Sequence, residues 1–173
     1  MKLILIGYRG CGKTSVGKRV AQTRGMQYLD VDDVTCERIG CDSIAKIWQE
    51  HGEPYWRENE VAATCELCKQ ENLVIGLGGG TLMQSGARQA VEQAKETIRI
   101  YLKASPQVLY QRITGDVRSS QTRPSLTALG GGLDEVQHML AQREPTYQAV
   151  ADVVLDINDM DLQQVTDAVL KHC

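Results

Sequence analysis

Gly7-Tyr-Arg-Gly-Cys-Gly-Lys-Thr14 matches the pattern G-x-x-x-x-G-K-[ST]. A continuous apolar run, Lys2 to Ile6, precedes this segment, and an amphipathic helix is expected to follow from Thr14 to Arg24. In this context the glycines let backbone N–H groups curl around phosphate oxygens, and the helix adds its positive N-terminal end. The stretch therefore predicts a loop that binds nucleotide phosphates. A glycine-rich turn with an incidental lysine is the alternative interpretation.

The rest of the chain alternates between expected strands and expected helices. Apolar runs of strand length follow the first one at 26–30, 73–77, 97–102 and 151–157. Helical patterns occupy 31–39, 43–51, 53–70, 86–95, a segment starting at Ser105-Pro106, 134–150 and 161–172. Such alternation is typical of a parallel sheet with helices on both faces. We expect one α/β domain over residues 1–173.

Composition narrows the class of protein. The chain has 173 residues, 42% of them hydrophobic and 24% charged, with a net charge of −3. These values are ordinary for a globular domain, and no apolar run approaches the roughly 20 residues of a membrane span. A negative net charge gives no reason to expect a nucleic-acid partner or an anionic membrane. We expect a cytoplasmic monomer with neither kind of partner.

The six cysteines admit two interpretations. Cys65 and Cys68 form a C-x-x-C, and Cys36 with Cys41 supplies a second pair of conceivable zinc ligands. However, the first pair falls within a single expected helix, and the spacing of the second pair is wider than that of a usual zinc knuckle. We expect free thiols.

A phosphate loop alone does not separate kinases from switches and motors. The chain lacks an Asn-Lys-x-Asp segment and a Leu-Ser-Gly-Gly-Gln segment, which are typical of guanine-specific and transporter nucleotidases. A small-molecule kinase instead needs an acceptor pocket and a closing lid that excludes water. Residues 115–133 are polar and without periodicity, and a loop of that length is expected to be the lid.

Candidate acceptor groups follow the second and third expected strands. Asp30, Asp32 and Asp33 end the second strand, where one carboxylate could lie near magnesium and another could take a hydroxyl proton. Favourable interaction with the next helix dipole is the alternative explanation for these acids. Gly78-Gly79-Gly80 ends the third strand and indicates a ligand lying against bare backbone, unless it is only a flexible turn.

These motifs, in this order, resemble those of the shikimate kinase family over essentially the whole chain. The segments that carry the resemblance are the phosphate loop, Leu29-Asp-x-Asp32, Gly52-Glu-x-x-Trp-Arg57-x-x-Glu60, Gly78-Gly-Gly80, Arg123-Pro124, Arg143-x-x-x-Tyr147 and Ala151-Asp-Val-Val-x-Asp156. The resemblance implies a five-stranded parallel sheet in the order 2-3-1-4-5. It also implies ATP-dependent phosphorylation of the 3-hydroxyl of shikimate, giving shikimate 3-phosphate and ADP, in aromatic amino-acid biosynthesis.

The expected site residues combine the loop pattern with this resemblance. Shikimate is expected to be held by Asp32, Arg57, Gly78, Gly79, Gly80 and Arg143. Of these, the two arginines are expected to bind its carboxylate. ATP is expected at Gly10, Cys11, Gly12, Lys13, Thr14, Ser15, Arg112 and Arg123, with Arg112 near the adenine. Mg²⁺ is expected at Thr14 and, through water, at Asp30. The expected catalytic residues are Lys13, Asp32 and the lid residue Arg123, although water could replace Asp32 as proton acceptor.

Two other functions compete with this one. A kinase of another sugar acid or polyol, such as gluconate, would share the phosphate loop and an acid after the second strand. A nucleotide-binding module without catalysis would leave Asp32, Arg57 and Arg143 without a role.

Overall fold

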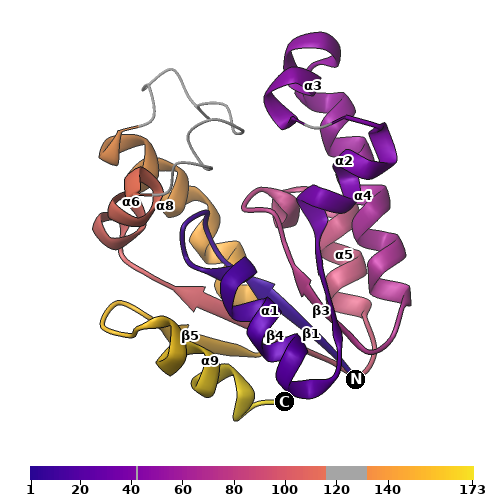
Figure 1. Cartoon of the computed structure of the whole chain (residues 1–173). Helices are drawn as coiled ribbons and strands as arrows, with labels where there is room; N and C mark the ends of the chain where they lie inside the picture. The colour runs from indigo at the N-terminus through magenta and orange to yellow at the C-terminus, as the bar shows by residue number, and fades with distance from the viewer. Residues whose placement is uncertain (42, 116–131) are drawn as a thin grey trace.

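The computed structural model describes residues 1–41, 43–115 and 132–173, and within these ranges five strands form one parallel sheet. The sheet has the order β2-β3-β1-β4-β5 (Figure 1). Its strands are β1 (Lys2–Ile6), β2 (Gln27–Asp30), β3 (Leu73–Gly76), β4 (Thr97–Lys103) and β5 (Val153–Asp156). The predicted fold class and strand order are confirmed.

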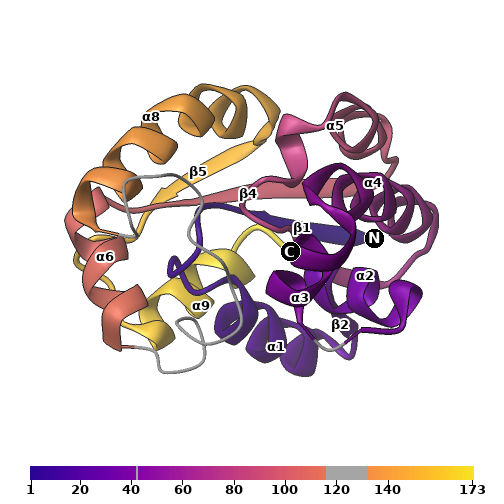
Figure 2. The same cartoon turned by 90° about the horizontal axis from the view of Figure 1, so that it is seen from above.

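Helices cover both faces of the sheet. The described helices are α1 (Lys13–Arg24), α2 (Val31–Ile39), α3 (Ile44–His51), α4 (Glu53–Lys69), the short 3₁₀ helix η1 (Thr81–Met83), α5 (Ser85–Gln93), α6 (Pro106–Gly115), α8 (Leu133–Val150) and α9 (Leu162–Leu170). Helices α1 and α9 lie on one face, and α4, α5 and α8 lie on the other (Figure 2). Helices α2 and α3 pack against α4 at the β2 side of the molecule.

The central strand explains the position of the core. Every residue of β1 is buried, as expected of a parallel strand covered on both faces. The chain contains no Phe, and its core is built from Leu, Ile and Val together with buried tyrosines such as Tyr101 and Tyr147. At the sheet edge, β5 instead alternates between half-buried and exposed residues.

Local signals at the helix ends had different outcomes. The Ser105 hydroxyl accepts a hydrogen bond from the Val108 N–H at 3.4 Å, so this N-cap is confirmed. Ser43 occupies the N-cap position of α3, but its side chain makes no capping hydrogen bond. Pro145 lies inside α8, which continues from Leu133 to Val150.

Three features of the described residues bear on function. No helix within the described ranges is both long and apolar enough to cross a membrane. All six cysteines are free thiols, and Cys65 and Cys68 both lie on α4. In the same described ranges, no group of three or more His, Cys, Asp or Glu side chains is placed to hold a metal ion.

Candidate active site

The loop between β1 and α1 has the backbone conformation that its glycines predict. Gly10 and Gly12 have φ of +83° and +95°, in the region that residues with a side chain rarely adopt. A Cβ on Gly10 would lie 2.9 Å from Ile113 Cγ1 and 3.1 Å from the Leu109 carbonyl oxygen. Both the turn and the close approach of α6 therefore require glycine at position 10.

Lys13 closes this loop from inside. Its side chain is only 9% exposed, and its ammonium donates to the carbonyl oxygens of Gly7 at 2.7 Å and Tyr8 at 3.1 Å. The thiol of Cys11, buried beside it, lies 3.6 Å from the same ammonium. Thr14 and Ser15, by contrast, begin α1 with exposed side chains. The loop thus concentrates positive charge and keeps the hydroxyls of α1 accessible.

Asp30 connects this loop to the end of β2. One carboxylate oxygen accepts from the Asp32 N–H at 3.1 Å, so Asp30 is the N-cap of α2. The other accepts from the Thr14 hydroxyl at 3.3 Å and from the Tyr28 hydroxyl at 2.9 Å. Burial raises the pKa of Tyr28, and the charge of Asp30 raises it further, so the Tyr28 hydroxyl remains a donor. Asp30 therefore has a structural role at the start of α2, and it also has an oxygen beside Thr14.

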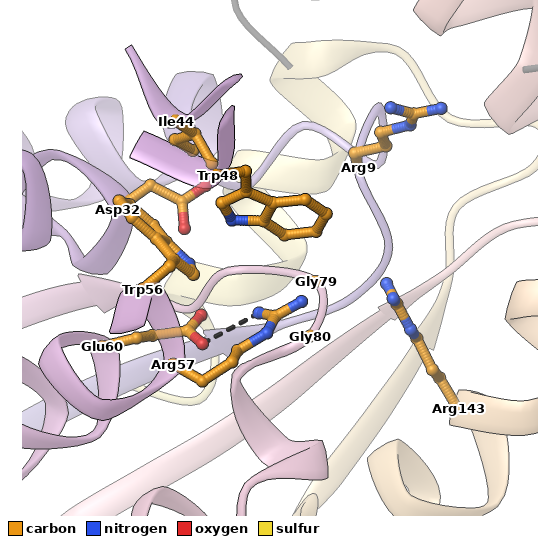
Figure 3. A pocket seen from close by; sticks show the side chains of 10 residues that line it. All are labelled: Arg9, Asp32, Ile44, Trp48, Trp56, Arg57, Glu60, Gly79, Gly80 and Arg143. Atoms are coloured by element: carbon orange, nitrogen blue, oxygen red, sulfur yellow. Dashed lines mark hydrogen bonds and ion pairs between the residues drawn. The ribbon is translucent and has the colours of Figure 1, made fainter. Parts of the chain in front are cut away.

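Beside the loop is a pocket at the carboxyl edge of the sheet (Figure 3). The phosphate loop contributes to its wall through Arg9, and a Cβ on Gly79 would lie 3.6 Å from the Arg9 backbone nitrogen. The residues that line the pocket are Arg9, Asp32, Ile44, Trp48, Trp56, Arg57, Glu60, Gly79, Gly80 and Arg143. Five of the six residues predicted to hold the acceptor therefore line one pocket.

Arg57 is held in this pocket by two carboxylates of its own helix. Its Nε and one terminal nitrogen donate to Glu53 Oε1 at 2.9 and 2.8 Å, and the other donates to Glu60 Oε2 at 2.9 Å. Burial alone would lower the pKa of Arg57, but Glu60 and Glu53 outweigh it and raise that pKa. A Cβ on Gly80 would lie 2.7 Å from Arg57 Nη1, so the bare backbone is what admits the guanidinium.

Arg143 reaches the same pocket from α8. It is 6% exposed, and its guanidinium lies over the ring of Tyr8, 5.6 Å from the ring centroid. None of the ion pairs between described residues involves Arg143, and its neighbour Glu144 instead pairs with Lys103 at 3.0 Å. Arg143 therefore lines the pocket without a carboxylate partner among the residues that the structure describes.

Gly78, the sixth predicted acceptor residue, lies behind the pocket wall. A Cβ at this position would lie 2.5 Å from Asp32 Oδ1 and 2.8 Å from Glu60 Oε1. Glu60 is 1% exposed and accepts from the Thr81 hydroxyl at 2.6 Å. Gly78 thus makes room for the two carboxylates and does not line the pocket itself.

The residue predicted to lie near the adenine contacts the loop that follows β5. Arg112, near the end of α6, donates to the Ile157 carbonyl oxygen at 3.5 Å, just after β5. The Asn158 side chain accepts from the Ser105 N–H at 2.8 Å, which ties the same loop to the start of α6. Arg123 and nearly all of the predicted lid, residues 116–131, lie outside the described residues.

Several residues that line the pocket had no role predicted from the sequence. Arg9 occupies a variable position of the loop pattern, and its guanidinium pairs with the fully buried Glu135 at 3.4 Å. Ile44 and Trp48 lie one turn apart on α3, and this apolar spacing was the only available signal. Glu60 belongs to a motif in the sequence, but nothing in that motif indicates that its side chain lies in the pocket.

These features together define the class of protein. A Walker-type loop follows the central strand of a 2-3-1-4-5 parallel sheet, and a pocket for an anionic acceptor adjoins it at the same sheet edge. This arrangement is that of a P-loop kinase for small molecules.

Comparison with known proteins narrows the class to one family. Residues 9–173 match the family model described as "Shikimate kinase". A shikimate kinase from Rhodopirellula baltica is 38% identical over 98% of this chain and 88% of the relative, and one from Caldanaerobacter subterraneus is 33% identical over 98% and 94%. A shikimate kinase from Acinetobacter baumannii, solved in complex with shikimate, superposes with a TM-score of 0.88 at 27% identity over 99% of this chain and 91% of that one. The chain belongs to the shikimate kinase family.

Proposed function

We propose that the pocket between α3, α4 and α8 holds shikimate while the adjoining loop holds ATP, whose γ-phosphoryl group passes to the 3-hydroxyl. As a member of its family, the chain is an enzyme that phosphorylates shikimate, in aromatic amino-acid biosynthesis. The observation that carries the proposed site is the convergence of Asp32, Arg57 and Arg143 beside the phosphate loop. The products are then shikimate 3-phosphate and ADP.

The two arginines suit the carboxylate of the acceptor. A planar guanidinium can donate two parallel hydrogen bonds to a carboxylate, and a lysine cannot reproduce that geometry. Arg57 is oriented by Glu53 and Glu60, and Arg143 by the face of Tyr8. Because each guanidinium is held before the acceptor arrives, little side-chain entropy remains to be lost on binding.

Asp32 suits the hydroxyl groups of the acceptor. Its carboxylate enters the pocket from the first turn of α2, on the other side from Arg143 (Figure 3). An ionised carboxylate accepts hydrogen bonds from hydroxyls and can take the proton of the attacking one. Gly79 and Gly80 complete the pocket, and their bare backbone lies close to the ring of the bound shikimate. Helices α2 to α4, within residues 31–70, thus form the acceptor-binding part of the domain.

The phosphate loop suits ATP. Backbone N–H groups of residues 10–15 and the N-terminus of α1 are assigned to the phosphates, and Lys13 to the β–γ bridge, where charge grows as the bond breaks. We assign Arg112, beside the loop that follows β5, to the adenine. The role of Arg123 at the transferring phosphoryl group rests on the family resemblance alone.

The residues at the end of β2 suit Mg²⁺. The Thr14 hydroxyl and the Asp30 carboxylate lie 3.3 Å apart, and both are the oxygen ligands that this ion prefers, directly or through water. When bound, the ion would neutralise charge on the phosphates. Thr14 would hold it, and Asp30 would orient Thr14 while still capping α2.

A coupled ADP-release assay tests the proposal. The purified chain is incubated with ATP, Mg²⁺ and, separately, shikimate, quinate, gluconate or no acceptor. Of these acceptors, only shikimate is expected to support turnover. Turnover with gluconate would favour the competing sugar-acid kinase; a gluconokinase from Sinorhizobium meliloti, at TM-score 0.63 and 20% identity, shares the fold only. ATP binding without turnover on any acceptor would favour a non-catalytic module. The monomeric state and the cytoplasmic location stay predictions, and light scattering checks the first.

A further inference from the structure

Among the described residues, two that line the acceptor pocket have a buried side-chain nitrogen without a protein partner: Arg9, whose guanidinium still pairs with Glu135 through another nitrogen, and Trp48. The indole nitrogen of Trp48 is buried, and it makes no hydrogen bond with any residue of the described ranges. Buried donors without a partner are uncommon in folded proteins, and each one calls for an explanation. Since Trp48 lines the pocket, a bound ligand is the natural source of an acceptor.

The orientation of Trp48 is fixed by its neighbours. Ile44, one turn earlier on α3, lines the same wall, and Ile47 anchors the helix in the interior. The Arg57 guanidinium lies over the indole, 5.6 Å from the ring centroid, and is itself tied to Glu53 and Glu60. The stacked guanidinium therefore favours the orientation of the indole plane.

The position of the indole selects the part of the ligand it could meet. Figure 3 shows Trp48 between Asp32 and Arg57, with its ring nitrogen toward the side of Asp32 and Trp56. The carboxylate of the acceptor already has guanidinium donors in Arg57 and Arg143. An ionised carboxylate such as Asp32 can only accept, so it satisfies hydroxyl hydrogens and leaves hydroxyl oxygens in need of a donor.

We propose that the Trp48 indole N–H donates a hydrogen bond to a ring-hydroxyl oxygen of bound shikimate, which makes Trp48 a specificity-determining residue of the acceptor site. This inference rests on the proposed function, because it assumes that shikimate occupies the pocket. In this arrangement Asp32 accepts from the acceptor's hydroxyls and Trp48 donates to one of them. An acceptor lacking that hydroxyl would leave the buried indole N–H unpaired, and a site with an unpaired buried polar group discriminates against such a ligand.

The test removes the N–H and keeps the ring. Trp48→Phe is compared with a variant carrying β-(3-benzothienyl)alanine at position 48, in which sulfur replaces the N–H with little change of shape. Calorimetric titration with shikimate should give a Kd about three- to tenfold higher for both variants, the range of one neutral hydrogen bond. The KM for ATP should not move. Of 3-deoxyshikimate, 4-deoxyshikimate and 5-deoxyshikimate, one should bind wild type and both variants with equal affinity.

The outcomes separate this inference from the proposed function. If the benzothienyl variant binds shikimate as tightly as wild type, the contact does not exist, whatever Trp48→Phe does. If all three deoxy analogues still bind wild type more tightly than the variants, by the same factor as shikimate does, the indole acts through packing and the inference is wrong. If wild type itself binds no shikimate, or if Arg57→Ala leaves its affinity for shikimate unchanged, the proposed site fails first.

Discussion

Glu60 and Arg57 form an ion pair of 2.9 Å in which the carboxylate is almost fully buried and the guanidinium faces the acceptor pocket. The second oxygen of Glu60 accepts from Thr81, just after the glycine turn. One side chain therefore links helix α4, the end of β3 and the arginine assigned to the substrate carboxylate.

Glu60→Gln should weaken shikimate binding without touching the nucleotide. The amide can keep the hydrogen bond to Thr81, but it cannot balance the charge of Arg57, which is then less well held. The KM for shikimate should rise about three- to tenfold, with kcat and the KM for ATP nearly unchanged. Glu58→Gln, an exposed neighbour on the same helix, is the control. An unchanged KM would show that Arg57 is oriented by Glu53 alone.

Arg57→Ala and Arg143→Ala should each raise the KM for shikimate at least about tenfold, since a charged hydrogen bond contributes about 1.5–3 kcal/mol. The KM for ATP should stay close to that of wild type. Arg88→Ala is a matched control, because Arg88 makes the same kind of pair with Glu92 on the surface of α5.

The carboxylate assignment itself needs a change in the ligand. Shikimate whose carboxylate is reduced to an alcohol should be a poor substrate for wild type, and the two arginine variants should discriminate against it much less. If the penalty is the same for wild type and both variants, these arginines do not recognise the carboxylate.

Gly80→Ala should leave the protein folded and impair acceptor binding. Gly80 has φ −102°, which alanine adopts freely, but the new methyl group would displace the guanidinium of Arg57. We expect the KM for shikimate to rise and Tm to change little. A large loss of Tm in Gly80→Ala would mean that the turn, and not Arg57, absorbs the methyl group.

Lys13→Ala should reduce kcat to below about a tenth of wild type, because stabilisation of the β–γ bridge is lost in the transition state. Lys13 is also buried and bonded to two loop carbonyls, so Tm should fall as well. Lys18→Ala, on the exposed side of the same helix, should alter neither. Turnover above that tenth in the folded variant would remove Lys13 from the catalytic residues.

The six thiols should differ in their rates of alkylation. Burial raises the pKa of Cys68 to about 11, so at pH 8 it is almost entirely the unreactive thiol. Cys11 is buried inside the phosphate loop. Iodoacetamide followed by peptide mass spectrometry should therefore label the partly exposed Cys36, Cys41 and Cys65 before these two. Rapid labelling of Cys11 in the folded protein would show that the loop opens.

The sequence predicted residues whose place is set locally or by topology. Consecutive residues determine the phosphate loop, so Lys13 and Thr14 needed no other information. The rule that ligands lie at the carboxyl edge of parallel strands predicted Asp32 and the glycine turn at one edge of the sheet, where Asp32, Gly79 and Gly80 line one pocket. Arg57 and Arg143 lie on helices far apart in the chain, and only the family resemblance brought them together.

What the sequence could not predict depends on packing. The rotation of the short helix α3 decides whether Trp48 faces solvent or the pocket, and an eight-residue pattern leaves this open. Glu60 is one of several glutamates in a helical sequence pattern, and that pattern does not show that its charge is buried. Gly78 was assigned to the ligand, whereas its space is taken by the side chains of Asp32 and Glu60.

The acceptor pocket contains both tryptophans of the chain, Trp48 and Trp56. The indole fluorescence of the whole molecule therefore originates at one site, with no background from elsewhere. When the emission is excited selectively over tyrosine, its intensity or wavelength should respond directly to an acceptor entering the pocket. The unmodified protein is thus its own optical sensor, and it can report acceptor occupancy during turnover without a coupled enzyme or an attached dye.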